Sequence, residues 1–348
     1  MDIYLTVNEV ANFLGITVQG LHKLCREQKF RTKYGTKHKI YPKVFRDILS
    51  LKGMKLDSKK LLLTIHAIKG GLGKTTIAHC LGVRASCYGF KTLIIDLDKQ
   101  ANLSESFQIF EDQGNMTIFD VFKNIIRDKN SNFSVKEAIV KVSDYLHIIP
   151  SDIEVANFDL EVLVSRLPVH DLFEELLEEV IDEYDVILFD LPADFNSITL
   201  AAHIFTKKCL IPMELTAFSE KGVKLTEDHI ARAQKIGNSK IDFILQGNFF
   251  DQRKADAIDE IGELKHKYGD RFSSVIIPIS QPIKTNLGTG KFLWSLPKSK
   301  APALVAFENI LLNLLNFEKK HMKPQPKTLE PHIISAANSH SKGVTQNA

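Results

Sequence analysis

From residue 61 onward, short apolar runs alternate with longer segments of helical periodicity. Runs typical of buried strands occupy 61–67, 91–97, 146–150, 185–190, 208–213, 241–247 and 274–279. Continuous apolar strands separated by helices predict an α/β fold with a mostly parallel sheet that helices cover on both faces. A last amphipathic helix is predicted at 302–317, and the polar residues 319–348 are expected to be disordered.

The beginning of the chain follows a different pattern, that of a small helical module. Thr6 and Glu9 form a capping-box pattern before a helical stripe of apolar residues. A turn containing Gly15 leads into a second apolar stripe, and a third helix is predicted from Pro42. Two short helices joined by such a turn predict a helix-turn-helix, which a basic hairpin at 31–41 follows.

Together these patterns predict four segments along the chain. They are a helix-turn-helix domain at 1–55, a linker at 56–60, an α/β domain at 61–318 and a disordered polar tail at 319–348. The helix-turn-helix with its hairpin resembles a winged or MerR-like DNA-binding domain. A basic helical module for dimerisation or docking is the alternative interpretation of the first segment.

Charge is distributed unevenly along the 348 residues, although the formal net charge is only +3. Residues 1–60 carry 13 Lys and Arg against 5 Asp and Glu, whereas the remainder is slightly acidic. A basic module joined to an acidic one suggests that the first contacts a polyanion such as DNA. The candidate DNA-binding residues are Gln19, His22, Lys23, Arg26, Lys37 and Lys39.

Several classes of protein are disfavoured by what the sequence lacks. No apolar run is long enough to span a membrane, and the N-terminus has no secretory signal. The four cysteines are scattered without a C-x-x-C pair, as expected for reduced thiols. We therefore expect a cytoplasmic protein without disulfides or a zinc site.

The segment 69–76, Lys-Gly-Gly-Leu-Gly-Lys-Thr-Thr, carries the clearest chemistry. It lies between a predicted strand and a predicted helix, which is the setting of a phosphate-binding loop. Glycines let the backbone approach a polyphosphate, and the first N–H groups of the helix are available to the anion. Lys74 would contact the β- and γ-phosphates, and the Thr75 hydroxyl would bind Mg²⁺. The predicted nucleotide-binding residues here are Lys69, Gly70, Gly71, Leu72, Gly73, Lys74, Thr75 and Thr76.

This loop departs from the ordinary G-x-x-x-x-G-K-[ST] pattern. Ile68 stands where glycine is expected, and Lys69 is an additional lysine. K-G-G-x-G-K-T-T resembles the deviant Walker A box of the ParA/MinD group of ATPases. The resemblance implies ATP as the ligand, and it implies that Lys69 crosses a homodimer interface to the partner's nucleotide. A Gly-rich turn with two solvated lysines is the alternative.

Two further segments end predicted strands with acidic residues. The stretch that begins at Asp96 resembles the family's D-x-D-P-Q-x-N-L-S box, with Lys99 in place of the proline. The resemblance implies that Asp96 helps to organise the metal site and that Asp98 positions or activates the attacking water. Asp190 ends an apolar strand in the manner of a Walker B acid, so it would hold Mg²⁺ directly or through water.

The resemblance covers about residues 61–318 and is less specific toward the end. It implies that Asn248 contacts adenine and that the segment around Pro278 lies near the base. It also implies DNA-facing basic residues in the C-terminal segment, for which the candidates are Lys284, Lys291, Lys298 and Lys300. The implied function is a plasmid-type DNA-partition ATPase, nucleoid-associated, with slow hydrolysis that a ParB-type centromere-binding protein stimulates.

Three other classes compete with this interpretation. A transcription regulator that uses ATP only as a ligand would bind an operator without partner-stimulated hydrolysis. A MinD-like, membrane-recruited ATPase would use the terminal amphipathic helix as an anchor. A reductase resembling the nitrogenase iron protein would need cluster cysteines, which the spacing of Cys80, Cys87 and Cys209 does not match.

Overall fold

The computed structural model describes most of the chain. The described residues are 1–30, 39–54, 60–127, 134–165, 168–215, 219–251, 253, 257–297 and 301–316. Most of the predicted basic hairpin, including Lys37, lies outside them. So do nearly all of the predicted linker, the polar tail, and Lys298 and Lys300.

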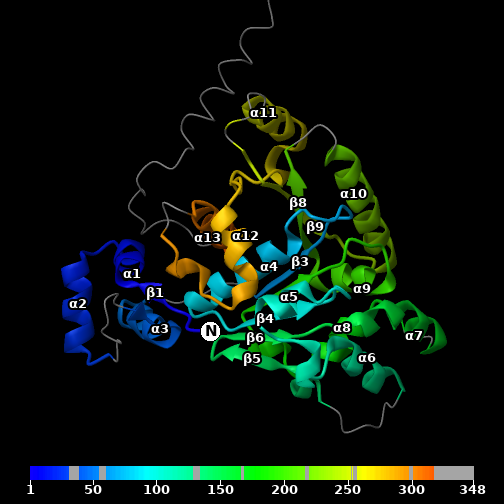
Figure 1. Ribbon diagram of the computed structural model, residues 1–348, viewed down its shortest axis with the longest axis horizontal. Coiled ribbons are helices and arrows are strands. Elements are labelled where there is room, and N and C mark those ends of the chain that lie inside the picture. Colours follow the sequence, from blue (N-terminus) through cyan, green and yellow to red (C-terminus); the bar gives the residue numbers. More distant parts are fainter. Residues whose placement is uncertain are drawn as a thin grey trace, which may run out of the picture.

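A seven-stranded sheet forms the centre of the molecule, with the strand order β5-β6-β4-β7-β3-β8-β9 (Figure 1). Every neighbouring pair is parallel except β5 with β6, so the edge strand β5 runs antiparallel. The strands are β3 (Leu61–Ile65), β4 (Thr92–Asp96), β5 (Val140–Ser143), β6 (Leu146–Ile149), β7 (Val186–Asp190), β8 (Lys208–Glu214) and β9 (Asp242–Asn248). The prediction of a mostly parallel sheet is therefore confirmed.

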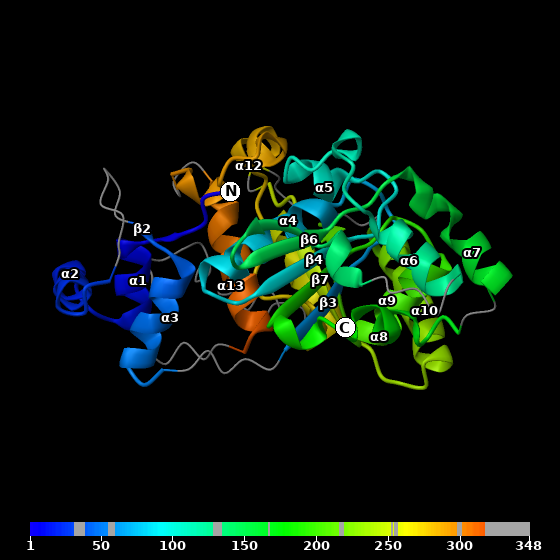
Figure 2. The same ribbon diagram turned by 90° about the horizontal axis from the view of Figure 1, so that it is seen from below.

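Helices cover both faces of this sheet. Figure 2 shows α4 and α13 on one side of the central strands and α8, α9 and α10 on the other. The helices of this part of the chain are α4 (Lys74–Cys87), α5 (Asn102–Ser106), α6 (Ile118–Arg127), α7 (Phe158–Ser165), α8 (Leu172–Leu177), α9 (Ser197–Thr206), α10 (Ser219–Ile236), α11 (Ala257–Tyr268), α12 (Gln281–Asn286) and α13 (Ala303–Leu314). Short 3₁₀ helices occupy 111–113, 135–138, 153–157, 181–183, 269–271, 287–289 and 293–295.

The order and register of the strands bring the predicted chemistry together. Strand β7 lies between β3 and β4, and its last residue Asp190 is in register with Ile65 on one side and Asp96 on the other. The phosphate-loop candidate leaves β3 at this same edge. Parallel strands thus place all three elements at one carboxyl edge, where ligands bind in such sheets.

One predicted strand is absent and one strand was missed. The run 274–279 forms one isolated bridge, between Pro278 and Phe250, and single hydrogen bonds instead of a strand, partly because Pro278 has no N–H to donate. Strand β5 escaped prediction because its residues are half-buried at the sheet edge and follow no continuous apolar run. Its antiparallel pairing also contains an irregularity near Ser143.

The N-terminal segment contains the helices that its pattern predicts. They are α1 (Val7–Leu14), α2 (Val18–Glu27) and α3 (Pro42–Leu51). The capping box is confirmed, since Thr6 Oγ1 accepts the Glu9 N–H while the Glu9 carboxylate accepts the Thr6 N–H. Gly15 ends α1 with φ of 65°, a left-handed conformation that glycine adopts readily. A two-stranded ribbon pairs β1 (Leu5–Thr6) with β2 (Lys39–Ile40).

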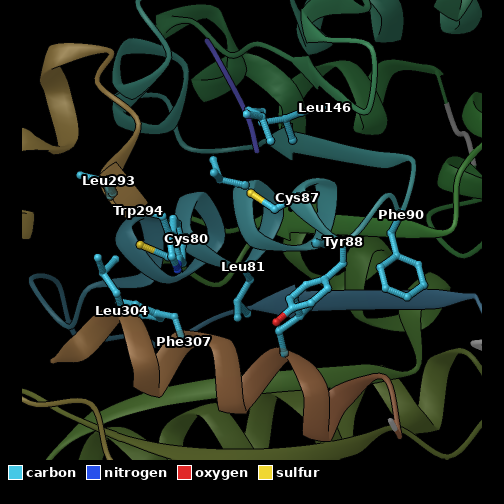
Figure 3. Packing of buried hydrophobic residues seen from close by; sticks show 14 of the residues in the cluster. Cys80, Leu81, Cys87, Tyr88, Phe90, Leu146, Leu293, Trp294, Leu304 and Phe307 are labelled. Carbon is cyan, nitrogen blue, oxygen red and sulfur yellow. The ribbon is translucent and has the colours of Figure 1, made fainter. Parts of the chain in front are cut away.

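This N-terminal segment does not stand apart from the rest of the chain, because one hydrophobic cluster includes residues of α1–α3, α4 and α13. Phe13 and Phe45 both pack on Tyr88, with ring centroids 5.7 and 5.8 Å away. Arg46 Nη1 donates to the Gly89 carbonyl at 2.9 Å. Figure 3 shows Tyr88, at the end of α4, reaching toward α13.

A buried ion network ties the same three parts together. Arg84 of α4 is fully buried, and its Nη2 lies 2.9 Å from carboxylates of both Glu9 in α1 and Glu308 in α13. The Tyr88 hydroxyl also donates to Glu308. Burial opposes the charge of Arg84, but Glu308, Tyr88 and Glu9 together raise its pKa well above the ordinary value. Segments far apart in sequence are thereby joined at the last turn of the phosphate-loop helix.

Candidate functional site

The loop between β3 and α4 has the conformation that its glycines allow. Gly71 and Gly73 have φ of 77° and 79°, and Gly73 caps the N-terminus of α4. A Cβ at Gly73 would lie 2.6 Å from Asn248 Nδ2, so a side chain there would displace a neighbour as well as strain the backbone. The loop therefore packs closely against Asn248 at the end of β9, and Lys74 follows it as the first residue of α4.

A cavity of about 1050 Å³ opens beside this loop. It is large enough for a nucleotide, and it is lined by residues from the loop, from the β4–α5 connection and from the C-terminal segment. Of the predicted site residues, those that line it are Gly70, Gly71, Leu72, Gly73, Lys74, Thr75, Thr76, Asp98, Asn248 and Pro278. The structure therefore brings these residues from four segments of the chain into one place.

Lys69 is held outside this lining. Its Nζ lies 2.6 Å from a carboxylate oxygen of Glu214, at the end of β8. Both side chains are partly exposed, and Glu214 itself lines the cavity. In this single chain Lys69 is therefore positioned at the rim by an ion pair that the sequence analysis did not foresee.

Lys74 is buried beside the acidic residues. Burial lowers its pKa, while the charges of Asp190 and Asp98 act in the opposite direction. A buried ammonium that faces a cavity is stabilised when an anion enters, because the anion replaces lost hydration. Lys74 is thus electrostatically prepared for a phosphate group.

Asp190 lies beneath the loop with both carboxylate oxygens buried and without a hydrogen bond of good geometry among the described residues. Burial and the charge of Asp96 raise its pKa well above the usual range, and the nearby Thr75 hydroxyl and Lys74 partly offset this. Carboxylate and hydroxyl oxygens are the ligands that Mg²⁺ prefers. The pairing of an unsatisfied carboxylate with Thr75 therefore fits a magnesium ion.

Asp96 has a different environment from Asp190. Its carboxylate accepts the Ser104 N–H at 2.9 Å, the Ser104 hydroxyl at 2.8 Å and the Asp98 N–H at 3.1 Å. Burial raises the pKa of Asp96 to about 6 despite these bonds. The carboxylate thus fixes the loop that presents Asp98 to the cavity. Lys99 is exposed in this loop, and Ala101 adopts a left-handed φ of 49°.

Asn248 is buried against the phosphate loop. Its Nδ2 donates to the Leu72 carbonyl at 2.8 Å, and its Oδ1 accepts the Phe249 N–H at 2.8 Å. The contact seen here clamps the loop backbone, whereas the predicted contact with adenine stays a prediction. Pro278 lies in the segment that bridges to Phe250, at the same cavity.

The candidate DNA-binding residues of α2 lie on one side of that helix. Gln19, Lys23 and Arg26 are exposed, and His22 is half-buried. Lys39, in contrast, forms an ion pair with Asp2 and lies over the Tyr4 ring, 4.3 Å from its centroid. Among the described C-terminal candidates, Lys284 and Lys291 are exposed, and Lys284 lines the cavity.

Three features of the site region were missed by the sequence analysis. Glu214 could have been noticed as an acid that ends an apolar strand, like Asp190. Arg84 is a charged residue inside an otherwise apolar helix, which signals a buried partner. A cluster of histidines behind the loop gave no signal, because its members come from separate elements.

The parallel sheet, the glycine-shaped loop and the acids beside it define an α/β P-loop NTPase fold. A family model described as an AAA domain matches residues 60–243, more than half of the chain, and the chain belongs to that family. It is 29% identical over 213 residues to the chromosome-partitioning ATPase Soj of Treponema pallidum, which covers 60% of this chain and 79% of that protein.

Solved structures share the fold at lower identity. The McdA–ATP complex from Cyanothece superposes with a TM-score of 0.62 at 21% identity, over 78% of this chain and all of the other. A putative plasmid partition protein of Borrelia burgdorferi bound to AMPPNP gives a TM-score of 0.58 at 22% identity, over 73% and 99%. No helix of the described residues is long and apolar enough to cross a membrane.

Proposed function

We propose that the chain is a ParA-type DNA-partition ATPase. The observation that carries this proposal is a convergence at one edge of the sheet: residues 70–76 of the extra-lysine phosphate loop and Asp98 line one cavity of about 1050 Å³, and Asp190 lies buried beneath the loop. The similarity to a protein named as a chromosome-partitioning ATPase supports the cellular role. Two copies would sandwich two ATP molecules, and each Lys69 would leave Glu214 to reach the other copy's nucleotide.

Hydrolysis would depend on positioning and charge neutralisation more than on covalent chemistry. Lys74 and the first N–H groups of α4 would stabilise charge on the transferring phosphoryl group, and Asp98 would orient the attacking water. When bound, Mg²⁺ would supply further neutralisation between the phosphates, held by Thr75 and Asp190. Among the described residues no group of three His, Cys, Asp or Glu side chains could hold a metal ion.

DNA is the partner that the charge distribution favours. The ATP-bound dimer would bind DNA non-specifically through cations such as Lys284 and Lys291, and a ParB-type partner would stimulate hydrolysis. Such contacts weaken steeply with salt. Operator recognition would use the exposed side of α2, because base readout needs an element that enters the major groove. This second role is favoured by the exposure of Gln19, Lys23 and Arg26.

The ATP-binding proposal is tested by Lys74→Ala. We expect loss of Mg·ATP binding, measured with a fluorescent ATP analogue, because the principal phosphate-binding cation is removed. Lys224→Ala is the matched control, since Lys224 is exposed on α10 and forms an ion pair with Asp228, four residues further along the helix. Normal ATP affinity in Lys74→Ala would show that the site assignment is wrong.

The two DNA-binding modes are tested with surface variants of the full chain. Lys23→Ala and Arg26→Ala should lower affinity for an operator duplex while leaving ATP-dependent binding to a scrambled duplex unchanged. Fluorescence anisotropy at two salt concentrations, with ATP or ADP, measures both. Point variants are preferable to deletion of 1–55, because α1–α3 share a core with α4 and α13. Equal losses on both duplexes would contradict the division of roles.

A further inference from the structure

Three buried histidines lie together behind the phosphate loop. His66 follows β3 directly, His203 belongs to α9 and His229 belongs to α10. The first two are fully buried and His229 is 6% exposed. Their ring centroids are 5.0 Å apart for His66 and His203, 5.7 Å for His66 and His229, and 5.6 Å for His203 and His229. None of them takes part in the hydrolysis described above.

Two of these histidines contact the loop 191–196, which continues from Asp190. His66 Nε2 lies 3.2 Å from the Asp194 carbonyl oxygen. The Phe195 ring stacks on His229 with centroids 4.4 Å apart and planes 28° apart. Ala193, in the same loop, lines the cavity. His66 and His229 therefore contact the loop that connects Asp190, the candidate metal-binding acid, to the cavity.

A continuous chain of polar contacts extends from the Asp194 carbonyl into the core. The first link joins the Asp194 carbonyl to His66 Nε2. The second joins His66 Nδ1 to His203 Nε2 at 2.9 Å, and the third joins His203 Nδ1 to Thr64 Oγ1 at 3.0 Å. Thr64 Oγ1 also lies 3.1 Å from the Lys208 carbonyl. The chain thus has four links between two carbonyl oxygens. Two neutral histidines and one hydroxyl supply only three protons, so one link must lack a hydrogen bond.

The direction of the protons decides which link is unfilled. Burial lowers the pKa of His66 to about 3 and that of His203 well below its usual value, so no fourth proton is held near neutral pH. The Asp194 carbonyl can only accept a hydrogen bond, so its link is filled only when His66 carries its proton on Nε2. If the two middle links are filled as well, His203 is also the Nε2–H tautomer, Thr64 donates to His203 Nδ1, and the link to the Lys208 carbonyl is the unfilled one.

We propose that His66, His203 and His229 are positioning residues for the phosphate end of the ATP site. His66 and His229 hold the loop 191–196 in place, and His203 with Thr64 selects the tautomer in which His66 can donate to Asp194. Because these contacts already order the loop 191–196, it needs no further ordering when nucleotide binds. Loss of the contacts should therefore lower the rate of hydrolysis more than the affinity for ATP. This inference rests on the proposed ATPase function.

The tautomer is tested directly by ring ¹⁵N NMR of the full-length protein labelled at histidine. Signals are assigned by their loss in His66→Gln and His203→Gln. We expect both rings to stay neutral with the proton on Nε2 from pH 8 to pH 5. A His66 ring that carries its proton on Nδ1, or that titrates near the ordinary pKa of about 6.5, would overturn the proposal.

The positioning role is tested by steady-state kinetics and ATP binding. We expect His66→Leu to lower kcat about tenfold with little change in ATP affinity, because the loop loses its donor. His66→Gln, whose amide can still donate, should recover most of the rate. His147→Leu is the matched control. His147 is also buried, but it lies on β6, away from this loop, and contacts the Tyr184 hydroxyl.

The outcomes separate the inference from the function beneath it. Wild-type kcat in folded His66→Leu, or an equal loss in His147→Leu, would show that the histidines only pack. If His66→Leu does not fold, the rate of His66→Gln and the NMR tautomers decide the matter. A wild-type protein that hydrolyses no ATP would instead refute the proposed function, whereas the NMR result would still show whether His66 donates to the loop.

Discussion

Replacing Arg84 with Met should destabilise the protein more than any surface change. The substitution keeps an apolar stem of similar length but removes the cation that lies 2.9 Å from both Glu9 and Glu308. The two carboxylates are 11% and 8% exposed, so they would be left without their buried counter-charge. Removing one partner of a buried ion pair costs about 3–5 kcal/mol. For a chain of 348 residues a loss of 1 kcal/mol lowers Tm by about 1.4 °C, so Tm should fall by roughly 4–7 °C.

Urea unfolding followed by tryptophan fluorescence provides the assay. Trp294 is the single tryptophan of the chain, and its ring centroid is 5.4 Å from Arg84 Cζ, so its emission reports on this network. Lys224→Met, at an exposed ion pair, is the control and should leave the free energy of unfolding nearly unchanged. Adding Glu308→Gln to Arg84→Met should recover part of the loss, because one uncompensated charge is removed. A loss below about 1 kcal/mol in Arg84→Met would refute the reasoning.

Three further predictions concern the site. Lys69→Ala should keep ATP binding but lose ATP-dependent dimerisation. If the variant with ATP elutes from a sizing column at the same volume as wild type with ATP, the sandwich dimer is contradicted. Asp98→Ala should accumulate an ATP-bound dimer because the water is no longer positioned; turnover at the wild-type rate would move this role elsewhere. Asp96→Asn should remove a pH dependence of stability. Burial raises the folded-state pKa of Asp96 from 3.8 to about 6, so the folded state binds the proton more tightly. Stability should therefore rise as pH falls from about 7 toward 4, by up to about 3 kcal/mol more in wild type than in the variant, which keeps the contribution of Asp190. Parallel unfolding curves of the two proteins across this range would contradict the assignment.

Much of the architecture followed from local patterns. The apolar runs predicted six of the strands in the central sheet to within a few residues, because a strand buried on both faces must be apolar throughout. The capping box at Thr6 and the glycine at the end of α1 set the bounds of that helix from the sequence. The phosphate loop was equally local, since its glycines, lysine and threonine act within eight consecutive residues.

Only the tertiary structure determined those features that depend on residues distant in sequence, such as the hydrogen-bond partners of buried acids. Asp96 and Asp190 both end strands, yet one is satisfied by Ser104 and the other has two unsatisfied oxygens, a difference that packing alone produces. The segment 274–279 is apolar enough for a strand but lies beside β9 without regular pairing.

The links between distant segments were invisible to periodicity for the same reason. The partners of Arg84 lie 75 residues before it, in α1, and in the last helix. The three clustered histidines come from the residue after β3, from α9 and from α10, so no spacing along the chain relates them. A periodic pattern reports which face of an element is buried, whereas the identity of a buried polar partner depends on how the elements pack against one another.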